Sequence, residues 1–185
     1  MPSAPTPPNE PSRLATLHRY SILDSLSEPE FDDASALAAL ICGTPVSLVS
    51  LIDQDRQWFK AKVGIDISET PRSQSFCAHT LADSRTLIVP DAQQDNRFAD
   101  NPLVLGDPNI RFYAGAPIVA PNGHVLGTVC VLDTQPAFFL HNRSPPSKLS
   151  PARSWPSSKR EPISSRTGAP PPRSSKAKSS QPSAA

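Results

Sequence analysis

Two helices are predicted near the N-terminus from the spacing of apolar residues. Leu14, Leu17, Ile22 and Leu23 allow a short amphipathic helix, for which Ser12 can serve as the N-cap. A second and stronger start signal follows at residues 27–30. A periodic apolar face comes next, and Gly43 is well placed to end that helix.

The start signal of the second helix combines three features. Ser27 can cap the helix, Pro29 suits its first turn, and the neighbouring acids favour the positive end of the helix dipole. Five apolar residues then recur at helical spacing and predict one apolar face: Phe31, Ala34, Leu37, Ala38 and Ile41.

From residue 46 onward the pattern changes to that of β-strands. Five segments have the apolar runs or the alternation of strands: 46–52, 57–63, 86–89, 112–119 and 124–132. The first two predict a hairpin across 53–56, and Asn122-Gly123 is a strong hairpin signal between the last two. Hairpins dominate, so we expect a mostly antiparallel sheet with helices packed on it, an α+β fold.

The segments between these strands are expected to be loops and short helical pieces. Residues 70–72 are predicted as a loop and 75–81 as a short helix. Residues 91–108 are rich in Asp, Asn and Pro, which predicts a loop with one helical turn around 97–100.

Charge divides the chain into two unlike parts. Residues 1–136 hold 9 Lys and Arg against 16 Asp and Glu, a net charge of −7, whereas residues 137–185 hold 9 Lys and Arg against one acid, a net charge of +8. We therefore predict a disordered leader over 1–11, a folded domain over 12–136 and a disordered basic Ser/Pro tail over 137–185.

Several classes of protein are excluded or disfavoured by composition. No apolar run is long enough for a membrane-spanning helix, and the start of the chain does not resemble a secretory signal. Cys42, Cys77 and Cys130 form an odd set without a Cys-x-x-Cys motif, which argues against a disulfide framework or a zinc site. These features suit a reducing, cytoplasmic location.

A series of segments in fixed order closely resembles a bacterial GAF domain, of the type found ahead of histidine kinases and diguanylate cyclases. The similar segments are 41–53, Gln57-Trp58-Phe59-Lys60, 63–64, 69–72, Ser75-Phe76-Cys77-Ala78-His79, 89–92, 95–102, 110–117 and 127–133. The resemblance covers roughly residues 10–136.

The resemblance implies a GAF-like α+β fold, with a central antiparallel sheet and helices on both faces. It also implies a regulatory module of a signal-transduction or two-component protein that binds an unknown small molecule and is not itself an enzyme. The expected partners are a second copy, forming a homodimer, or an attached effector; no cofactor is identified. Eight candidate ligand-binding residues are Trp58, Phe76, Cys77, His79, Asp91, Arg97, Arg111 and Tyr113.

Most of these candidates have a purely structural alternative. Trp58 can line a pocket or pack in the core. Arg97 and Arg111 can bind an anionic ligand through their forked donors, but an internal pair between Asp91 and one arginine is favoured. Cys77 can equally be a small buried apolar side chain.

Three chemistries seen in GAF relatives are less well supported. Attachment of a tetrapyrrole to Cys77 is disfavoured because Ala78 separates it from His79. A cyclic-nucleotide signature is incomplete around residues 96–100. The alternative enzyme is a thiol redox protein of the free-methionine sulfoxide reductase kind, which needs an exposed thiol of low pKa.

The basic tail supports two further hypotheses. Its charge alone suggests an interaction protein that binds nucleic acid through this tail, but aromatic residues for base stacking are nearly absent, so nucleic acid is not an expected partner. We favour a shift of reading frame near residues 137–144, because a shifted frame can encode an amphipathic helix. The nucleotide sequence tests this hypothesis.

Overall fold

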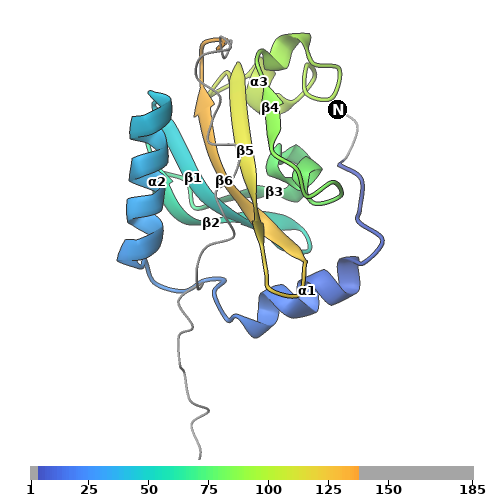
Figure 1. The fold of residues 1–185 in the computed structure, drawn as a ribbon. Helices are drawn as coiled ribbons and strands as arrows, with labels where there is room; N and C mark the ends of the chain where they lie inside the picture. The colour runs from blue at the N-terminus through green and yellow to red at the C-terminus, as the bar shows by residue number, and fades with distance from the viewer. Residues whose placement is uncertain (1–3, 138–185) are drawn as a thin grey trace, which may run out of the picture. The chain divides into compact units, whose positions relative to one another are not determined.

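The computed structural model describes residues 4–137, which form a six-stranded antiparallel sheet with helices on both faces (Figure 1). This confirms the predicted α+β class. The elements in chain order are α1 (Glu10–Arg19), α2 (Pro29–Cys42), β1 (Val46–Ile52), β2 (Arg56–Val63), β3 (Glu69–Pro71), η1 (Arg72–Gln74), η2 (Cys77–Thr80), β4 (Leu87–Val89), η3 (Ala92–Gln94), α3 (Pro102–Leu105), β5 (Phe112–Val119) and β6 (Val125–Asp133).

The strand order is β3-β2-β1-β6-β5-β4, and every neighbouring pair is antiparallel. Both predicted hairpins, β1–β2 and β5–β6, are confirmed. The predicted loop at residues 70–72 is wrong in part, because Glu69–Pro71 forms an edge strand in which Thr70 lies opposite Gln57 of β2. A proline is tolerated there because the strand lies at the edge of the sheet.

Helix α1 begins earlier than predicted. Asn9 occupies the N-cap position, and the Ser12 hydroxyl instead donates to the Asn9 carbonyl at 2.8 Å. Ile22 and Leu23 lie beyond the end of the helix. Disorder of residues 1–11 stays a prediction; in the structure, Ala4 packs against the core and Asn9 Nδ2 lies 3.0 Å from His124 Nδ1.

Helix α2 ends at the predicted glycine, but its N-cap and its buried face differ from the prediction. Glu28, not Ser27, is at the N-cap, while Gly43 ends the helix with φ of +64°, a left-handed conformation that glycine adopts without strain. Ser35 faces the sheet and donates to the Ser47 carbonyl at 3.0 Å. The expected burial of Leu37 is wrong, because it is 56 % exposed. A small residue at the contact lets the helix lie close to the strands.

The opposite face of the sheet is covered by short segments. The predicted helix at residues 75–81 is a 3₁₀ turn, η2. The turn expected around 97–100 is confirmed, since Ala99 N donates to the Asp95 carbonyl four residues earlier at 2.9 Å. Helix α3 follows and begins after Asn101. The Asn101 side chain accepts a hydrogen bond from Leu103 N at 2.9 Å, and it donates to the Gln74 carbonyl at 3.0 Å.

Strand alternation divides the buried residues into two layers. The layer on the η2 side forms a contiguous cluster that includes Leu48, Ile52, Phe59, Phe76, Cys77, Phe98, Tyr113, Cys130 and Leu132. Val49 and Leu51 alternate with these positions along β1 and are also buried, so they lie on the opposite face, where α2 packs. The sheet is thus covered on both sides, and the η2 side encloses the candidate site.

The predicted tail, and the hypothesis that it results from a shifted reading frame, lie outside the described residues from 138 onward. Within residues 4–137, no helix combines the length and the apolar character needed to cross a membrane.

Candidate functional site

A cavity of about 90 Å³ lies between the sheet and the segments that cover its η2 side. It is large enough for several water molecules or a small organic molecule. Its walls come mainly from apolar side chains, among them Val46, Leu48, Phe59, Ile65, Phe76, Leu103, Ile110 and Leu132. A mostly apolar cavity with a few polar groups is the usual form of a small-molecule site.

Three polar residues stand together at one wall of this cavity. Gln57 and Thr70 are register partners on β2 and β3, and the Ser75 hydroxyl donates to Gln57 Oε1. Ser75 Oγ in turn accepts from Ala78 N at 3.0 Å. The Thr70 hydroxyl is buried and has no hydrogen-bond partner among the described residues. A buried polar group without a partner is unfavourable, so Thr70 offers a hydrogen bond to a molecule in the cavity.

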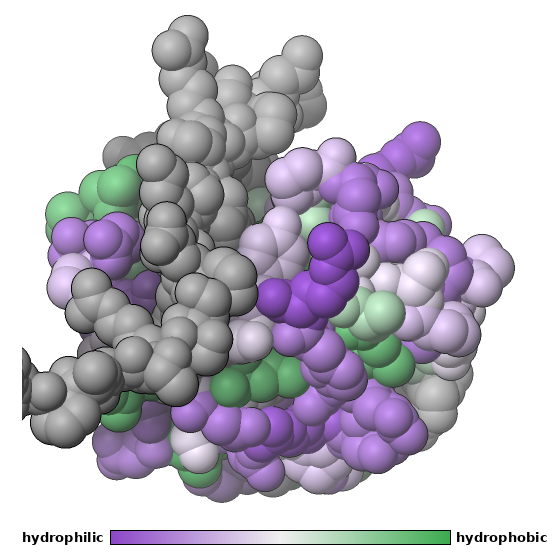
Figure 2. All heavy atoms as spheres, turned by 90° about the horizontal axis from the view of Figure 1, so that it is seen from below, coloured by the Kyte–Doolittle hydropathy of each residue, from purple (hydrophilic) through white to green (hydrophobic). Residues whose placement is uncertain are grey.

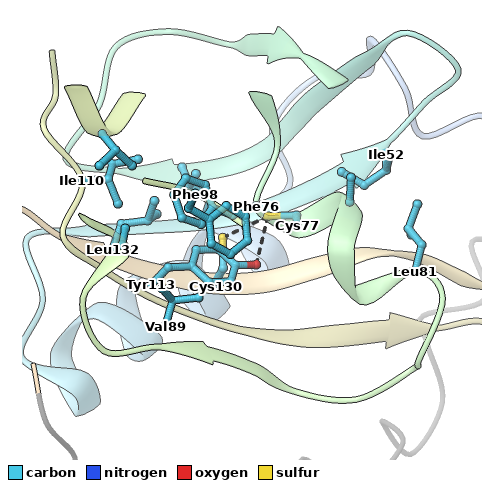
Figure 3. Packing of buried hydrophobic residues seen from close by; sticks show 14 of the residues in the cluster. Ile52, Phe76, Cys77, Leu81, Val89, Phe98, Ile110, Tyr113, Cys130 and Leu132 are labelled. Atoms are coloured by element: carbon cyan, nitrogen blue, oxygen red, sulfur yellow. Dashed lines mark hydrogen bonds between the residues drawn. The ribbon is translucent and has the colours of Figure 1, made fainter. Parts of the chain in front are cut away.

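Two aromatic residues and two thiols also line the cavity, namely Phe76, Tyr113, Cys77 and Cys130, and they pack together in the buried cluster (Figure 3). Phe76 stacks on Phe98 with ring centroids 4.1 Å apart and lies 5.2 Å from the Tyr113 ring. The Tyr113 hydroxyl donates to Cys77 Sγ at 3.2 Å, and Cys77 Sγ lies 3.6 Å from Cys130 Sγ. The structure therefore brings three of the predicted residues, Phe76, Cys77 and Tyr113, to one cavity.

The two thiols have opposite protonation preferences. Burial raises the pKa of Cys77, but hydrogen bonds with Cys130, Ser50, Thr128 and Tyr113 more than offset this, so the pKa lies below its usual range. The hydrogen bond with Cys77 and burial raise the pKa of Cys130. Cys77 is thus the one of the pair that more readily becomes a thiolate.

Trp58 does not line the cavity. It is buried, but it belongs to neither the cavity lining nor the cluster on that face, and its neighbour Phe59 belongs to both. The prediction that Trp58 lines a pocket is therefore wrong, and the alternative of core packing is correct. Successive side chains of a strand point to opposite faces, so only one of the two rings can reach the cavity.

His79 is also outside the cavity lining. Its ring packs edge-on against Phe98 with centroids 4.8 Å apart, and its Nε2 is buried without a partner among the described residues. Burial and the nearby Arg97 lower the pKa of His79, against a smaller opposite effect of Asp95. The neutral imidazole is therefore favoured.

The two arginines are engaged in ion pairs away from the cavity. Arg111 Nε donates to Asp91 Oδ1 and Arg111 Nη2 donates to Asp91 Oδ2, both at 2.7 Å. The structural alternative, an internal ion pair of Asp91 with one arginine, is thus confirmed. Hydrogen bonds from Arg111, more than offsetting burial, lower the pKa of Asp91. Arg97 makes a two-pronged contact with Asp95 at 2.9 and 2.6 Å. The hypothesis of an anion bound by these arginines gains no support from this geometry.

Sequence reasoning missed Gln57, Thr70 and Ser75. The sequence feature that could have identified them is a polar residue within an otherwise apolar or strand-like segment. Only the pairing of β2 with β3 shows that Gln57 and Thr70 face the same cavity. No group of three potential metal ligands occurs in the described part of the chain. The enzyme alternative requires an exposed thiol of low pKa, but exposed Cys42 has its pKa raised by partial burial, and Cys77 is buried.

Comparison with curated proteins identifies one clear relative. The chain is 43 % identical over 143 residues to a cyclic di-GMP phosphodiesterase of Pseudomonas aeruginosa, an alignment that covers 77 % of this chain and 24 % of that protein. The chain thus spans about a quarter of the length of this relative.

Solved structures with a similar fold include two proteins of low sequence identity. The GAF domain of an Acinetobacter phosphoenolpyruvate-protein phosphotransferase has a TM-score of 0.48 at 19 % identity, covering 70 % of this chain and 82 % of that chain. A free methionine-R-sulfoxide reductase of Neisseria meningitidis has a TM-score of 0.49 at 15 % identity, covering 69 % and 74 %.

The model of the GAF domain family matches residues 12–144, a span that starts at the predicted domain boundary and ends eight residues beyond the predicted one at 136. Together with the antiparallel sheet and the identity to the Pseudomonas protein, this match establishes that the chain belongs to the GAF domain family.

Proposed function

We propose that this GAF domain is a regulatory module that binds a small molecule in the cavity beside β1, β2 and β6, and that it performs no catalysis itself. The observation that carries the proposal is the buried hydroxyl of Thr70, which has no partner within residues 4–137, at the wall of a mostly apolar cavity. Burying a hydroxyl without a partner costs free energy that a bound hydrogen-bonding ligand recovers.

The cavity favours an uncharged ligand. Among the described residues, its lining holds the carboxylate of Asp133 and no cationic side chain, while Arg97 and Arg111 are paired with carboxylates elsewhere. A negatively charged ligand would lose its hydration without gaining a cationic partner. The ligand class is therefore a small neutral molecule with an apolar body and one or two hydrogen-bonding groups, placed to meet Thr70 and Gln57.

The domain's place in signalling follows by analogy with its relative. The Pseudomonas protein is named as a cyclic di-GMP phosphodiesterase, and this chain matches only about a quarter of it. We infer that the domain supplies regulatory input to an effector of that kind. Participation in a two-component system and a cytoplasmic location stay predictions.

The signal leaves the domain through α2, which we propose pairs with α2 of a second copy. Leu37, Leu40 and Ile41 are 56 %, 78 % and 60 % exposed and lie on the helix that contacts β1, β2 and β6. In Figure 2, hydrophobic surface lies at the left margin, the side on which α2 lies in Figure 1. A ligand that changes the sheet can thus change a helical interface, provided that it binds two arrangements with different affinity.

A titration of the full chain with two matched probes tests the cavity proposal. Phenol is neutral, and benzoate has the same ring with a negative charge. We expect saturable amide chemical-shift changes in the nuclear magnetic resonance spectrum with phenol, centred on residues that line the cavity, and a much weaker response with benzoate. Equal responses, or phenol shifts scattered over the surface, would contradict the proposal.

Thr70→Val tests the residue that carries the argument. Valine keeps the shape of threonine but removes the hydroxyl, so the phenol affinity should fall about fivefold, the loss of roughly 1 kcal/mol of hydrogen bonding. Thr86→Val is the matched control, because Thr86 is exposed and lies outside the cavity. An unchanged affinity in Thr70→Val would show that this hydroxyl does not contact the probe.

A further inference from the structure

The two buried thiols of the cavity wall are not required by the proposed ligand-binding role. Cys77 lies on η2 and Cys130 on the central strand β6, and their Sγ atoms lie 3.6 Å apart (Figure 3). A disulfide needs an S–S distance of about 2.05 Å, so a closure of roughly 1.5 Å joins them. Both sulfurs are buried side by side, on a short turn and on the strand that the turn covers.

The surroundings of Cys77 stabilise a thiolate. The Tyr113 hydroxyl donates to its sulfur, and two further hydroxyls, of Ser50 and Thr128, lie close by and 3.1 Å from each other. Burial raises the pKa of Tyr113 well above its usual range, so its proton remains available as a donor. The thiolate is the reactive form of cysteine.

Cys130 is suited to the complementary role. Its pKa is raised, so it remains a protonated thiol beside the thiolate of Cys77. A reactive thiolate with a second thiol in contact is the arrangement in which a sulfenic acid is resolved to a disulfide. Both residues line the cavity, which gives a small molecule access to sulfurs that are buried from the surface.

We propose that Cys77 and Cys130 form a reversible thiol–disulfide site at the wall of the cavity, with a small hydroperoxide as the oxidant. The Cys77 thiolate attacks one oxygen of hydrogen peroxide, the O–O bond breaks, and Cys77 sulfenic acid and hydroxide form. Cys130 then attacks this sulfur, its proton leaves with the hydroxyl group as water, and the disulfide forms. A small dithiol reverses the reaction by exchange and becomes oxidised itself.

This site extends beyond ligand binding, because it makes the state of the cavity depend on thiol oxidation. A disulfide would fix η2 to β6 and alter the wall that Phe76 and Tyr113 share. The oxidation itself needs no cavity ligand, so its test is independent of the phenol titrations.

The test uses the full chain with Cys42→Ser, which removes the exposed thiol and its intermolecular disulfides. After treatment with hydrogen peroxide, mass spectrometry should show the loss of two hydrogen atoms, and a non-reducing digest should link the peptides of Cys77 and Cys130. Dithiothreitol should restore both thiols. If both cysteines still react fully with maleimide after peroxide treatment and denaturation, the proposal is overturned.

Two further variants assign the roles within the pair. With Cys130→Ser, dimedone should trap a sulfenic acid on Cys77, whereas with Cys77→Ser, Cys130 should remain reduced. Tyr113→Phe keeps the ring but removes the donor, so oxidation of Cys77 should slow about fivefold. Circular dichroism verifies that each variant folds. Trapping on Cys130 in Cys77→Ser at the rate seen for Cys77 would overturn the assignment of Cys77 as the attacking thiol.

Discussion

At the scale of single residues, Thr70 links stability to binding. Its buried hydroxyl has no partner among the described residues, so Thr70→Val should raise the free energy of unfolding of the ligand-free protein by about 1 kcal/mol while weakening phenol binding. Chemical denaturation of the two proteins without phenol measures this. A valine variant less stable than the parent would indicate that the hydroxyl is already satisfied.

The Asp91–Arg111 pair predicts a stability difference that depends on pH. The pKa of Asp91 is lowered in the fold, so this group stabilises the protein above its unfolded pKa, and this stabilisation is lost as the pH falls through the lower, folded pKa. Asp91→Asn should lower the free energy of unfolding at pH 7 by about 1–2 kcal/mol.

The quantity to measure is the difference in the free energy of unfolding between the parent protein and Asp91→Asn at several pH values. We expect this difference to be largest at pH 7 and to shrink below about pH 4, near the unfolded pKa of an aspartate. Urea denaturation at several pH values measures it. A difference that stays constant down to pH 3 would contradict a charge-based role for Asp91.

The sequence did not show which face of a strand meets the cavity, and this limited the prediction of individual site residues. Alternation shows that Trp58 and Phe59 point to opposite sides, but both sides of β2 are buried, so the pattern alone did not identify which ring faces the cavity. A pair between Asp91 and one arginine was predictable from charge, but only the structure shows that the partner is Arg111 and not Arg97. Thr70 was not recognisable, because its strand contains only three residues.

At the scale of elements, α2 should control self-association. Leu40 is 78 % exposed on this helix, so Leu40→Glu should convert a dimer of the full chain to a monomer in sedimentation velocity experiments. Leu105→Glu is the control, because Leu105 is 67 % exposed but lies on α3. A monomeric parent protein, or loss of the dimer in both variants, would contradict the proposed α2 interface.

The contact between β1 and β6 depends on a glycine. A Cβ on Gly127 would lie 1.9 Å from the Ser50 carbonyl oxygen, whereas one on Gly106 would be 3.3 Å from its nearest neighbour. Gly127→Ala should therefore reduce the free energy of unfolding by about 2–3 kcal/mol, and Gly106→Ala much less. Thermal denaturation compares the two; equal melting temperatures would show that the strands separate without cost.

The strands were predictable and the covering segments were not. The bounds of β1 and β5 match the prediction because apolar runs between turn signals define them. The short elements η3 and α3 are capped by the side chains of Asp91 and Asn101, and local sequence patterns do not specify these bonds. Apolar spacing on α2 did not show which residues pack on the sheet, because Leu37, Leu40 and Ile41 share that spacing and are exposed.

At the scale of the whole molecule, the sheet joins the two surfaces for which we propose a function. The cavity lies on one side and α2 on the other, and β1 and β6 contribute to both through alternate side chains. Leu48 and Cys130 therefore face the cavity from the same two strands whose other face packs against α2, the helix that we propose carries the signal. The nucleotide sequence across residues 137–144 remains the test of the reading-frame hypothesis.

The most direct test of the account is the position of bound phenol. Intermolecular nuclear Overhauser effects should connect the phenol ring protons with the methyl groups of Val46, Ile110 and Leu132, which line the cavity. Effects confined to Leu37 and Leu40, on the exposed face of α2, would place the probe at the helix surface instead and contradict the assignment of the cavity as the ligand site.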